Sequence, residues 1–106
     1  MKHVLFICSM NRWRSPTAEQ VFAEHPGIET ASAGLNGEAE VPLTAELLAW
    51  ADLIFVMEKK HRARLQKDFR PYIKHARIVC LDIPDDYKFM DPELVRILQA
   101  RVPQFL

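Results

Sequence analysis

The chain has 106 residues, of which 49% are hydrophobic, which is enough apolar material for one domain with a buried core. Its 14 Lys and Arg residues balance its 14 Asp and Glu residues, so the overall charge gives no reason to expect nucleic acid or a membrane surface as a partner. The apolar run of residues 4–8 is too short for a signal peptide, and no segment has the length of a membrane span. We therefore expect a single cytoplasmic domain over residues 1–106.

Apolar and amphipathic segments alternate along the chain. Short apolar runs predict buried strands at residues 4–8, 53–57 and 77–82, and residues 28–33 predict a second, weaker strand. The segments between them predict helices at about residues 16–25, 44–50 and 59–69, and Asp91-Pro92 opens a last helix. This alternation predicts an α/β fold, a single doubly wound domain whose four-stranded parallel sheet has the order 2-1-3-4 and helices on both faces. Ligands of such sheets bind beyond the carboxyl ends of the strands, where the first strand delivers Cys8.

A cysteine and an arginine flank the loop after the first strand. Cys8 and Arg14 have the spacing Cys-x5-Arg, and Ser15-Pro16 is expected to begin the following helix. A thiolate is a nucleophile, and a guanidinium can hold two oxygens of a phosphate at once. The backbone N–H groups of the loop and the positive end of the helix would favour the same anion. The loop is therefore predicted to stabilise the Cys8 thiolate and to bind phosphate or another tetrahedral oxyanion without a metal or cofactor.

Three segments resemble the low molecular weight protein tyrosine phosphatases. Residues 8–16 are similar to the family's phosphate-binding loop, residues 32–34 to the end of its second strand, and residues 53–58 to its third strand with a following Met-acid pair. The resemblance implies that Cys8 is the nucleophile and that Ser15 hydrogen-bonds it. It also implies a phosphate site made by the loop residues Ser9, Met10, Asn11, Arg12, Trp13, Arg14 and Ser15. Asn11 is a residue type that tolerates the left-handed backbone of a tight loop.

The loop departs from the family pattern at two positions. Met10 stands where the family usually has glycine, and Trp13 where it often has cysteine; the stretch between the second and third strands is also short. We expect Met10 to shape the mouth of the pocket and Trp13 to pack beneath the loop, with a place beside the pocket as the alternative for Trp13. For Arg12, contact with the surroundings of the substrate and simple exposure to solvent both remain open.

A proton donor for the leaving group is expected in residues 81–87, because this segment follows the fourth strand and reaches the same sheet edge as Cys8. The family has an aspartate there in a Pro-Asp-Pro-Tyr-like loop, with the tyrosine at the pocket wall. The resemblance thus makes Asp85 the general acid and Tyr87 the pocket wall, although an aspartate replaces the second proline. Three other aspartates remain alternatives: Asp86, Asp82, and Asp91, which reads more simply as the N-cap of the last helix.

The remaining chemically active residues are expected to be structural. Cys80 lies in an apolar strand, which favours an inert thiol over a redox partner of Cys8. The four histidines have no metal-ligand spacing and are interpreted as surface or packing residues: His3, His25, His61 and His75. The basic segment of residues 59–77 is interpreted as a solvated helix face, with a docking surface for an acidic or phosphorylated partner as the alternative.

Three functions of different kinds fit these residues. The first is a phosphomonoester hydrolase, resembling a protein tyrosine phosphatase, which acts on a phosphorylated protein or a small aryl phosphate through a cysteinyl-phosphate. The second is an arsenate reductase of the same fold, whose chemistry needs more cysteines than Cys80. The third is a phosphate-binding module with little catalysis. We predict the first, because nucleophile, arginine and acidic loop are all present.

Overall fold

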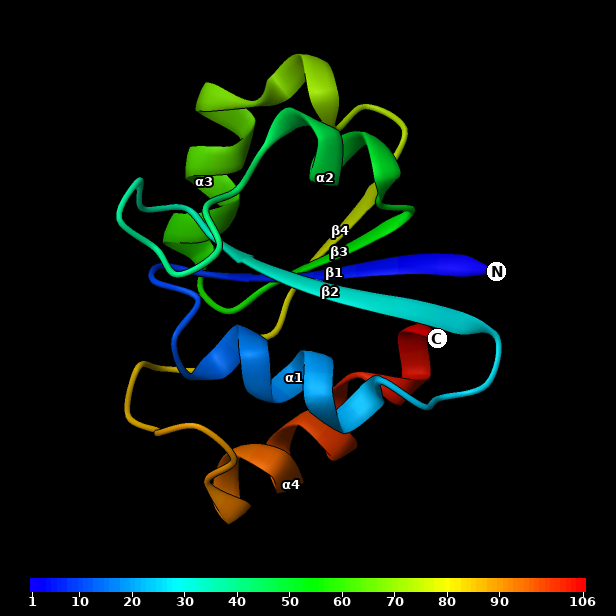
Figure 1. Ribbon diagram of the computed structural model, residues 1–106, viewed down its shortest axis with the longest axis vertical. Coiled ribbons are helices and arrows are strands. Elements are labelled where there is room, and N and C mark those ends of the chain that lie inside the picture. The colour runs from blue at the N-terminus through cyan, green and yellow to red at the C-terminus, as the bar shows by residue number, and fades with distance from the viewer.

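Four parallel strands form one sheet in the computed structural model, which describes all residues 1–106 (Figure 1). The strands are β1 (Lys2–Cys8), β2 (Ile28–Gly34), β3 (Leu53–Val56) and β4 (Arg77–Cys80). They are ordered β2-β1-β3-β4, and the predicted α/β fold with sheet order 2-1-3-4 is confirmed. β2 lies on one side of β1, and β3 and β4 lie on the other. The strand order therefore reverses beside β1, and a doubly wound sheet binds its ligand at the carboxyl ends of the strands at such a switch point.

Helices cover both faces of the sheet. They are α1 (Arg14–Phe22), α2 (Ala45–Trp50), α3 (Lys59–Asp68) and α4 (Pro92–Arg101). Figure 1 shows α1 and α4 on one face and α2 and α3 on the other. Short 3-10 turns follow α3 at Arg70–Tyr72 and α4 at Pro103–Phe105. No helix is both long enough and apolar enough to cross a membrane.

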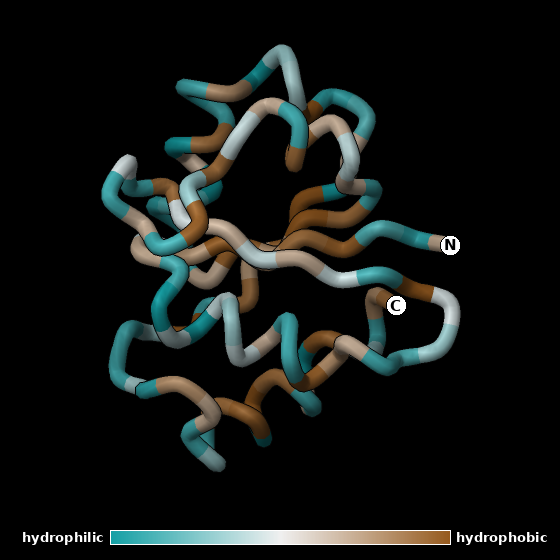
Figure 2. The backbone as a smooth tube through the Cα atoms, viewed as in Figure 1, coloured by the Kyte–Doolittle hydropathy of each residue, from teal (hydrophilic) through white to brown (hydrophobic).

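The central strands β1 and β3 are apolar on both faces because both faces are covered. Successive side chains of a strand point to opposite faces. Phe6 and Cys8 of β1 accordingly belong to the buried cluster beneath α1 and α4, whereas Leu5 and Ile7 belong to the cluster beneath α2 and α3. Figure 2 shows hydrophobic residues along β1, β3 and β4 between the two helical layers, whereas β2 at the edge is paler. This alternation directs the side chain of Cys8 toward the α1 face.

Three of the four predicted helix starts are confirmed, including that of α3 at Lys59, and one is wrong. The Thr44 hydroxyl accepts a hydrogen bond from Leu47 N at the start of α2, and the Asp91 carboxylate accepts one from Glu93 N at the start of α4. Helix α1, in contrast, begins at Arg14 and not at Pro16, because the Trp13 carbonyl already accepts the N–H of Thr17. Pro16 then lies in the first turn, where a missing N–H removes no helical hydrogen bond.

Candidate active site

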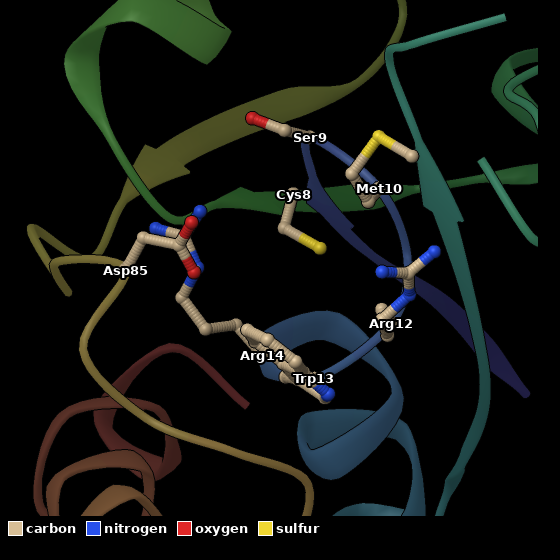
Figure 3. A pocket seen from close by; sticks show the side chains of 7 residues that line it. All are labelled: Cys8, Ser9, Met10, Arg12, Trp13, Arg14 and Asp85. Atoms are coloured by element: carbon tan, nitrogen blue, oxygen red, sulfur yellow. The ribbon is translucent and has the colours of Figure 1, made fainter. Parts of the chain in front are cut away.

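A pocket of about 60 Å³ opens at the carboxyl end of β1 (Figure 3). It is lined by six residues of the loop between β1 and the first turn of α1 and by one residue from the segment after β4: Cys8, Ser9, Met10, Arg12, Trp13, Arg14 and Asp85. The pocket therefore brings together the predicted nucleophile, the predicted phosphate-binding arginine and the predicted acid, although Asp85 follows Arg14 by 71 residues in the sequence.

The sulfur of Cys8 is surrounded by hydrogen-bond donors. The side chain is buried, its Sγ lies 3.0 Å from Ser15 Oγ, and Asn11 N donates to it over 3.2 Å. Asn11 Nδ2 donates to Ser15 Oγ over 2.9 Å, so the hydroxyl hydrogen of Ser15 is available for the sulfur or for the Ala33 carbonyl, which lies 3.5 Å from Ser15 Oγ. Asn11 itself has φ 53°, the left-handed conformation expected for it. Donors of this kind stabilise a thiolate more than a thiol.

The loop is held in shape by the segment that follows β2. The carbonyl oxygens of Cys8, Ser9 and Met10 accept hydrogen bonds from the N–H groups of Leu35, Asn36 and Glu40, at 3.0, 2.9 and 3.1 Å. These carbonyls are thereby directed away from the pocket, where their partial negative charge would oppose an anion. The loop and the segment after β2 can lie this close together because a glycine stands between them.

Gly34 is that glycine. A Cβ atom at this position would lie 2.7 Å from Ser9 O, 2.9 Å from Asn11 N and 2.5 Å from Ala39 Cβ. All three distances are shorter than ordinary contacts, and two of them involve backbone atoms, which cannot turn away as a flexible side chain can.

Arg14 is buried and bound on several sides. Its Nη1 donates to Glu58 Oε2 over 2.7 Å and to the Ile83 carbonyl over 2.8 Å, and its Nε lies 3.5 Å from Asp85 Oδ1. Burial alone would raise the pKa of Glu58, but the hydrogen bond and charge of Arg14 outweigh it and hold this pKa below its ordinary value. A buried guanidinium needs such a compensating carboxylate. The arrangement fixes Arg14 at the wall of the pocket.

His61 is a site residue that the sequence interpretation missed. It is buried at the start of α3, and its Nδ1 accepts a hydrogen bond from Glu58 N over 3.1 Å. The proton of the neutral ring therefore resides on Nε2, which lies 2.9 Å from Ser9 Oγ in the loop. Burial and the positive charge of Arg14 lower the pKa of His61 from 6.5 to about 4. The available signal was the spacing of Glu58 and His61, an acidic N-cap with a polar third helical residue.

The other predicted residues lie around the pocket or away from it. Met10 lines the pocket as expected. The prediction that Trp13 packs beneath the loop is wrong, and the alternative holds: Trp13 is 37% exposed and lines the pocket. The physical reason is the early start of α1, which makes Trp13 the N-cap residue and places it outside the helix body. Tyr87 is not among the lining residues; it packs, partly buried, against the cluster beneath α1 and α4.

The alternative acids do not line the pocket either. Asp86 is exposed, Asp82 is exposed with φ 54° and lies 3.5 Å from the Cys80 sulfur, and Asp91 caps α4. Among the aspartates that follow β4, Asp85 alone reaches the pocket. No group of three or more His, Cys, Asp or Glu side chains is placed to hold a metal ion.

The two cysteines belong to different faces of the sheet. Cys8 is part of the cluster beneath α1 and α4, whereas Cys80 packs against the cluster beneath α2 and α3. Burial raises the pKa of the Cys80 thiol. Because a disulfide needs Cβ atoms that face each other at close range, this placement does not support Cys80 as a resolving partner for Cys8. An arsenate reductase would need such a partner.

Comparison of the whole structure with solved structures gives three informative similarities. SP-PTP, a low molecular weight protein tyrosine phosphatase from Streptococcus pyogenes, superposes with a TM-score of 0.78 at 17% identity, over 100% of this chain and 94% of that one. The chain has the fold of the low molecular weight protein tyrosine phosphatases. Wzb from Vibrio vulnificus, in complex with benzylphosphonate, has a TM-score of 0.72 at 26% identity over 92% and 90% of the two chains. The YwlE arginine phosphatase of Geobacillus stearothermophilus has a TM-score of 0.73 at 22% identity over 94% and 84%.

The phosphatase fold is thus recognised from structure and not from overall sequence. No protein-family model matches the sequence, and no curated protein is similar to it in sequence. The structures with this phosphatase fold include both a tyrosine phosphatase and an arginine phosphatase by their names, so the fold does not by itself choose a substrate.

Proposed function

We propose that the protein is a phosphomonoester hydrolase, resembling a protein tyrosine phosphatase, that acts on a phosphorylated protein or a small aryl phosphate. The observation that carries the proposal is the presence of Cys8, Arg14 and Asp85 in one small pocket. These are a nucleophile, an anion-binding group and a proton donor, which are the three groups that a metal-independent phosphoryl transfer through cysteine requires. The complex of the structurally similar Vibrio vulnificus Wzb with benzylphosphonate supports an aryl-bearing phosphate as the ligand.

In the first step, the thiolate of Cys8 attacks phosphorus and forms the S–P bond of a cysteinyl-phosphate. The bond from phosphorus to the leaving oxygen breaks, and protonated Asp85 gives its proton to that oxygen. The backbone N–H groups of the loop and Arg14 stabilise the charge on the equatorial oxygens. Glu58 and Ile83 occupy Nη1 of Arg14, which leaves Nη2 for a phosphate oxygen.

In the second step, the same carboxyl group acts as a general base. Ionised Asp85 accepts a proton from a water molecule, whose oxygen attacks phosphorus and displaces the sulfur. Inorganic phosphate is released, and Cys8 returns to the thiolate. The hydrogen bonds of Ser15 and Asn11 to the sulfur stabilise the thiolate both as nucleophile and as leaving group.

The proposal is tested by measuring phosphate release from aryl phosphates with the wild type and three variants. We expect turnover by the wild type in the presence of a chelator. Cys8→Ser should abolish turnover while vanadate binding partly survives, because the loop amides and Arg14 remain. Arg14→Ala should lose both, and Cys80→Ser should retain both. Wild-type turnover in Cys8→Ser would exclude the covalent mechanism. Tight phosphate binding without turnover in the wild type would make the protein a phosphate-binding module.

A further inference from the structure

We propose that Arg12 selects phosphomonoesters whose leaving group carries a second negative charge, such as a carboxylate near the ester oxygen. The inference rests on the proposed function, because it concerns the substrate of the same pocket. It also predicts discrimination against a leaving group with a positive charge, such as the guanidinium of a phosphorylated arginine.

Arg12 lies at the mouth of the pocket, and its charge is paired only loosely, with Glu40. Figure 3 shows the Arg12 and Asp85 side chains on opposite sides of the Cys8 sulfur, with both lining the pocket. The Arg12 side chain is 53% exposed, and its Nε lies 3.6 Å from Glu40 Oε1, which is longer than a hydrogen bond. The guanidinium makes no hydrogen bond within the chain, so its fork of donors is available to a ligand.

The charges of the pocket explain why a ligand would use Arg12. The other guanidinium of the pocket, Arg14, is already matched by Glu58 at 2.7 Å and lies 3.5 Å from Asp85. Arg12 is the remaining cation of the lining. Its partner Glu40 is 61% exposed, and an exposed ion pair of this kind contributes little, so a substrate carboxylate can replace Glu40 at small cost. A planar guanidinium can then bind both oxygens of that carboxylate.

Substitution of Glu40 provides a second test of the role of Arg12. Its backbone N–H holds the Met10 carbonyl at 3.1 Å, which places its side chain beside the loop, but the side chain itself does not line the pocket. Removing its charge leaves Arg12 in place and takes away the competing carboxylate. Substitution of Arg12 and substitution of Glu40 should therefore change the substrate preference in opposite directions.

The experiment compares phenyl phosphate with carboxyphenyl phosphate, and the quantity measured is the ratio of their kcat/KM values. Intrinsic differences between the two leaving groups cancel when this ratio is compared between proteins. We expect Arg12→Gln to lower the preference for the carboxylated ester by about three- to tenfold. Glu40→Gln should raise it, and Glu38→Gln, an exposed control on the same loop, should leave it at the wild-type value. High salt should reduce all of these differences.

A binding measurement separates this inference from the proposed function. Phenylphosphonate and carboxyphenylphosphonate are titrated into Cys8→Ser protein with and without Arg12→Gln, and the ratio of their dissociation constants should follow the same pattern. The inference is overturned and the proposed function stands if the wild type hydrolyses phenyl phosphate, neither Arg12→Gln nor Glu40→Gln changes the ratio of kcat/KM values, and Arg12→Gln leaves the ratio of dissociation constants unchanged. If the wild type hydrolyses neither ester, the proposed function fails, and the phosphonate ratio still decides the role of Arg12. Failure of both phosphonates to bind would overturn both proposals.

Discussion

Ser9 and His61 are separated by 52 residues in the sequence, yet Ser9 Oγ lies 2.9 Å from His61 Nε2. This contact joins the loop after β1 to the first turn of α3. The same turn contributes Glu58, which binds Arg14, so α3 supports both ends of the loop. The Glu58 N–H that donates to Nδ1 requires an unprotonated nitrogen there, and the contact is therefore built for the neutral imidazole.

The neutral state of His61 predicts how stability depends on pH. The pKa of His61 is lowered from 6.5 to about 4, chiefly by burial and secondly by the charge of Arg14. Between these two values, the unfolded chain carries a proton on His61 that the folded chain does not carry. The free energy of unfolding must then fall as pH falls from about 6.5 to about 4.

Comparison of the wild type with His61→Gln isolates this contribution. On going from pH 7 to pH 5, the wild type should lose about 2 kcal/mol more of its free energy of unfolding than His61→Gln does. Urea denaturation at the two pH values measures both losses, and other titrating groups cancel in the difference. Equal losses in the two proteins would show that His61 is not held neutral by the fold.

Asp85 is expected to dominate the pH profile of catalysis. A general acid must be protonated for the first step, so Asp85→Asn should flatten the fall of the rate at high pH. It should also lower turnover of esters with poor leaving groups by about a hundredfold or more, and affect nitrophenyl phosphate much less. Asp86→Asn is the matched control, because Asp86 is exposed and does not line the pocket. Steady-state rates over a series of leaving groups decide between them. A dependence on leaving group that appears in Asp86→Asn alone would move the assignment to Asp86.

Gly34 should be intolerant of any side chain. A Cβ atom at Gly34 would lie 2.7 Å from Ser9 O and 2.5 Å from Ala39 Cβ, so Gly34→Ala must displace the loop or the segment after β2. We expect a loss of about 1–3 kcal/mol in the free energy of unfolding, together with weaker phosphate binding. Gly37→Ala is the control, since a Cβ at Gly37 meets nothing within 4 Å. Thermal unfolding with and without phosphate measures both effects. Equal stability of the two variants would contradict the close packing of Gly34.

The two cysteines should differ in their reaction with peroxide. Cys8 lies at the pocket with Ser15 and Asn11 directed at its sulfur, whereas burial raises the pKa of Cys80 and so lowers its thiolate fraction. Cys8 should be oxidised first, and bound phosphate should protect it. Mass spectrometry of peptides from briefly treated protein locates the product. Rapid formation of a Cys8–Cys80 disulfide would contradict their placement on opposite faces of the sheet and would make thiol-coupled arsenate reduction worth assaying.

The features that could be predicted from the sequence are those that depend on neighbours along the chain. The apolar runs of β1 and β3 and the alternation of strand and helix predicted a parallel sheet covered by helices, because strands covered on both faces are apolar throughout. The spacing of Cys8 and Arg14 likewise placed both residues on one loop. The start of α1 was missed, because Ser15 and Pro16 have the residue types of a helix start but the first helical hydrogen bond already involves Trp13.

Tertiary structure alone decided which residues surround that loop. Several aspartates follow β4, and although the resemblance pointed to Asp85, it is the path of the segment after β4 that brings its Oδ1 to 3.5 Å from Arg14 Nε. His61 has the sequence signature of a helix start, and its contact with Ser9 exists only because β3 lies beside β1 and delivers α3 to the loop. Gly34, in turn, lies against the loop only because β2 pairs with the other side of β1. Contacts of this kind join segments that are distant in sequence, so they depend on strand order and packing and leave no period or spacing in the chain from which they could be predicted.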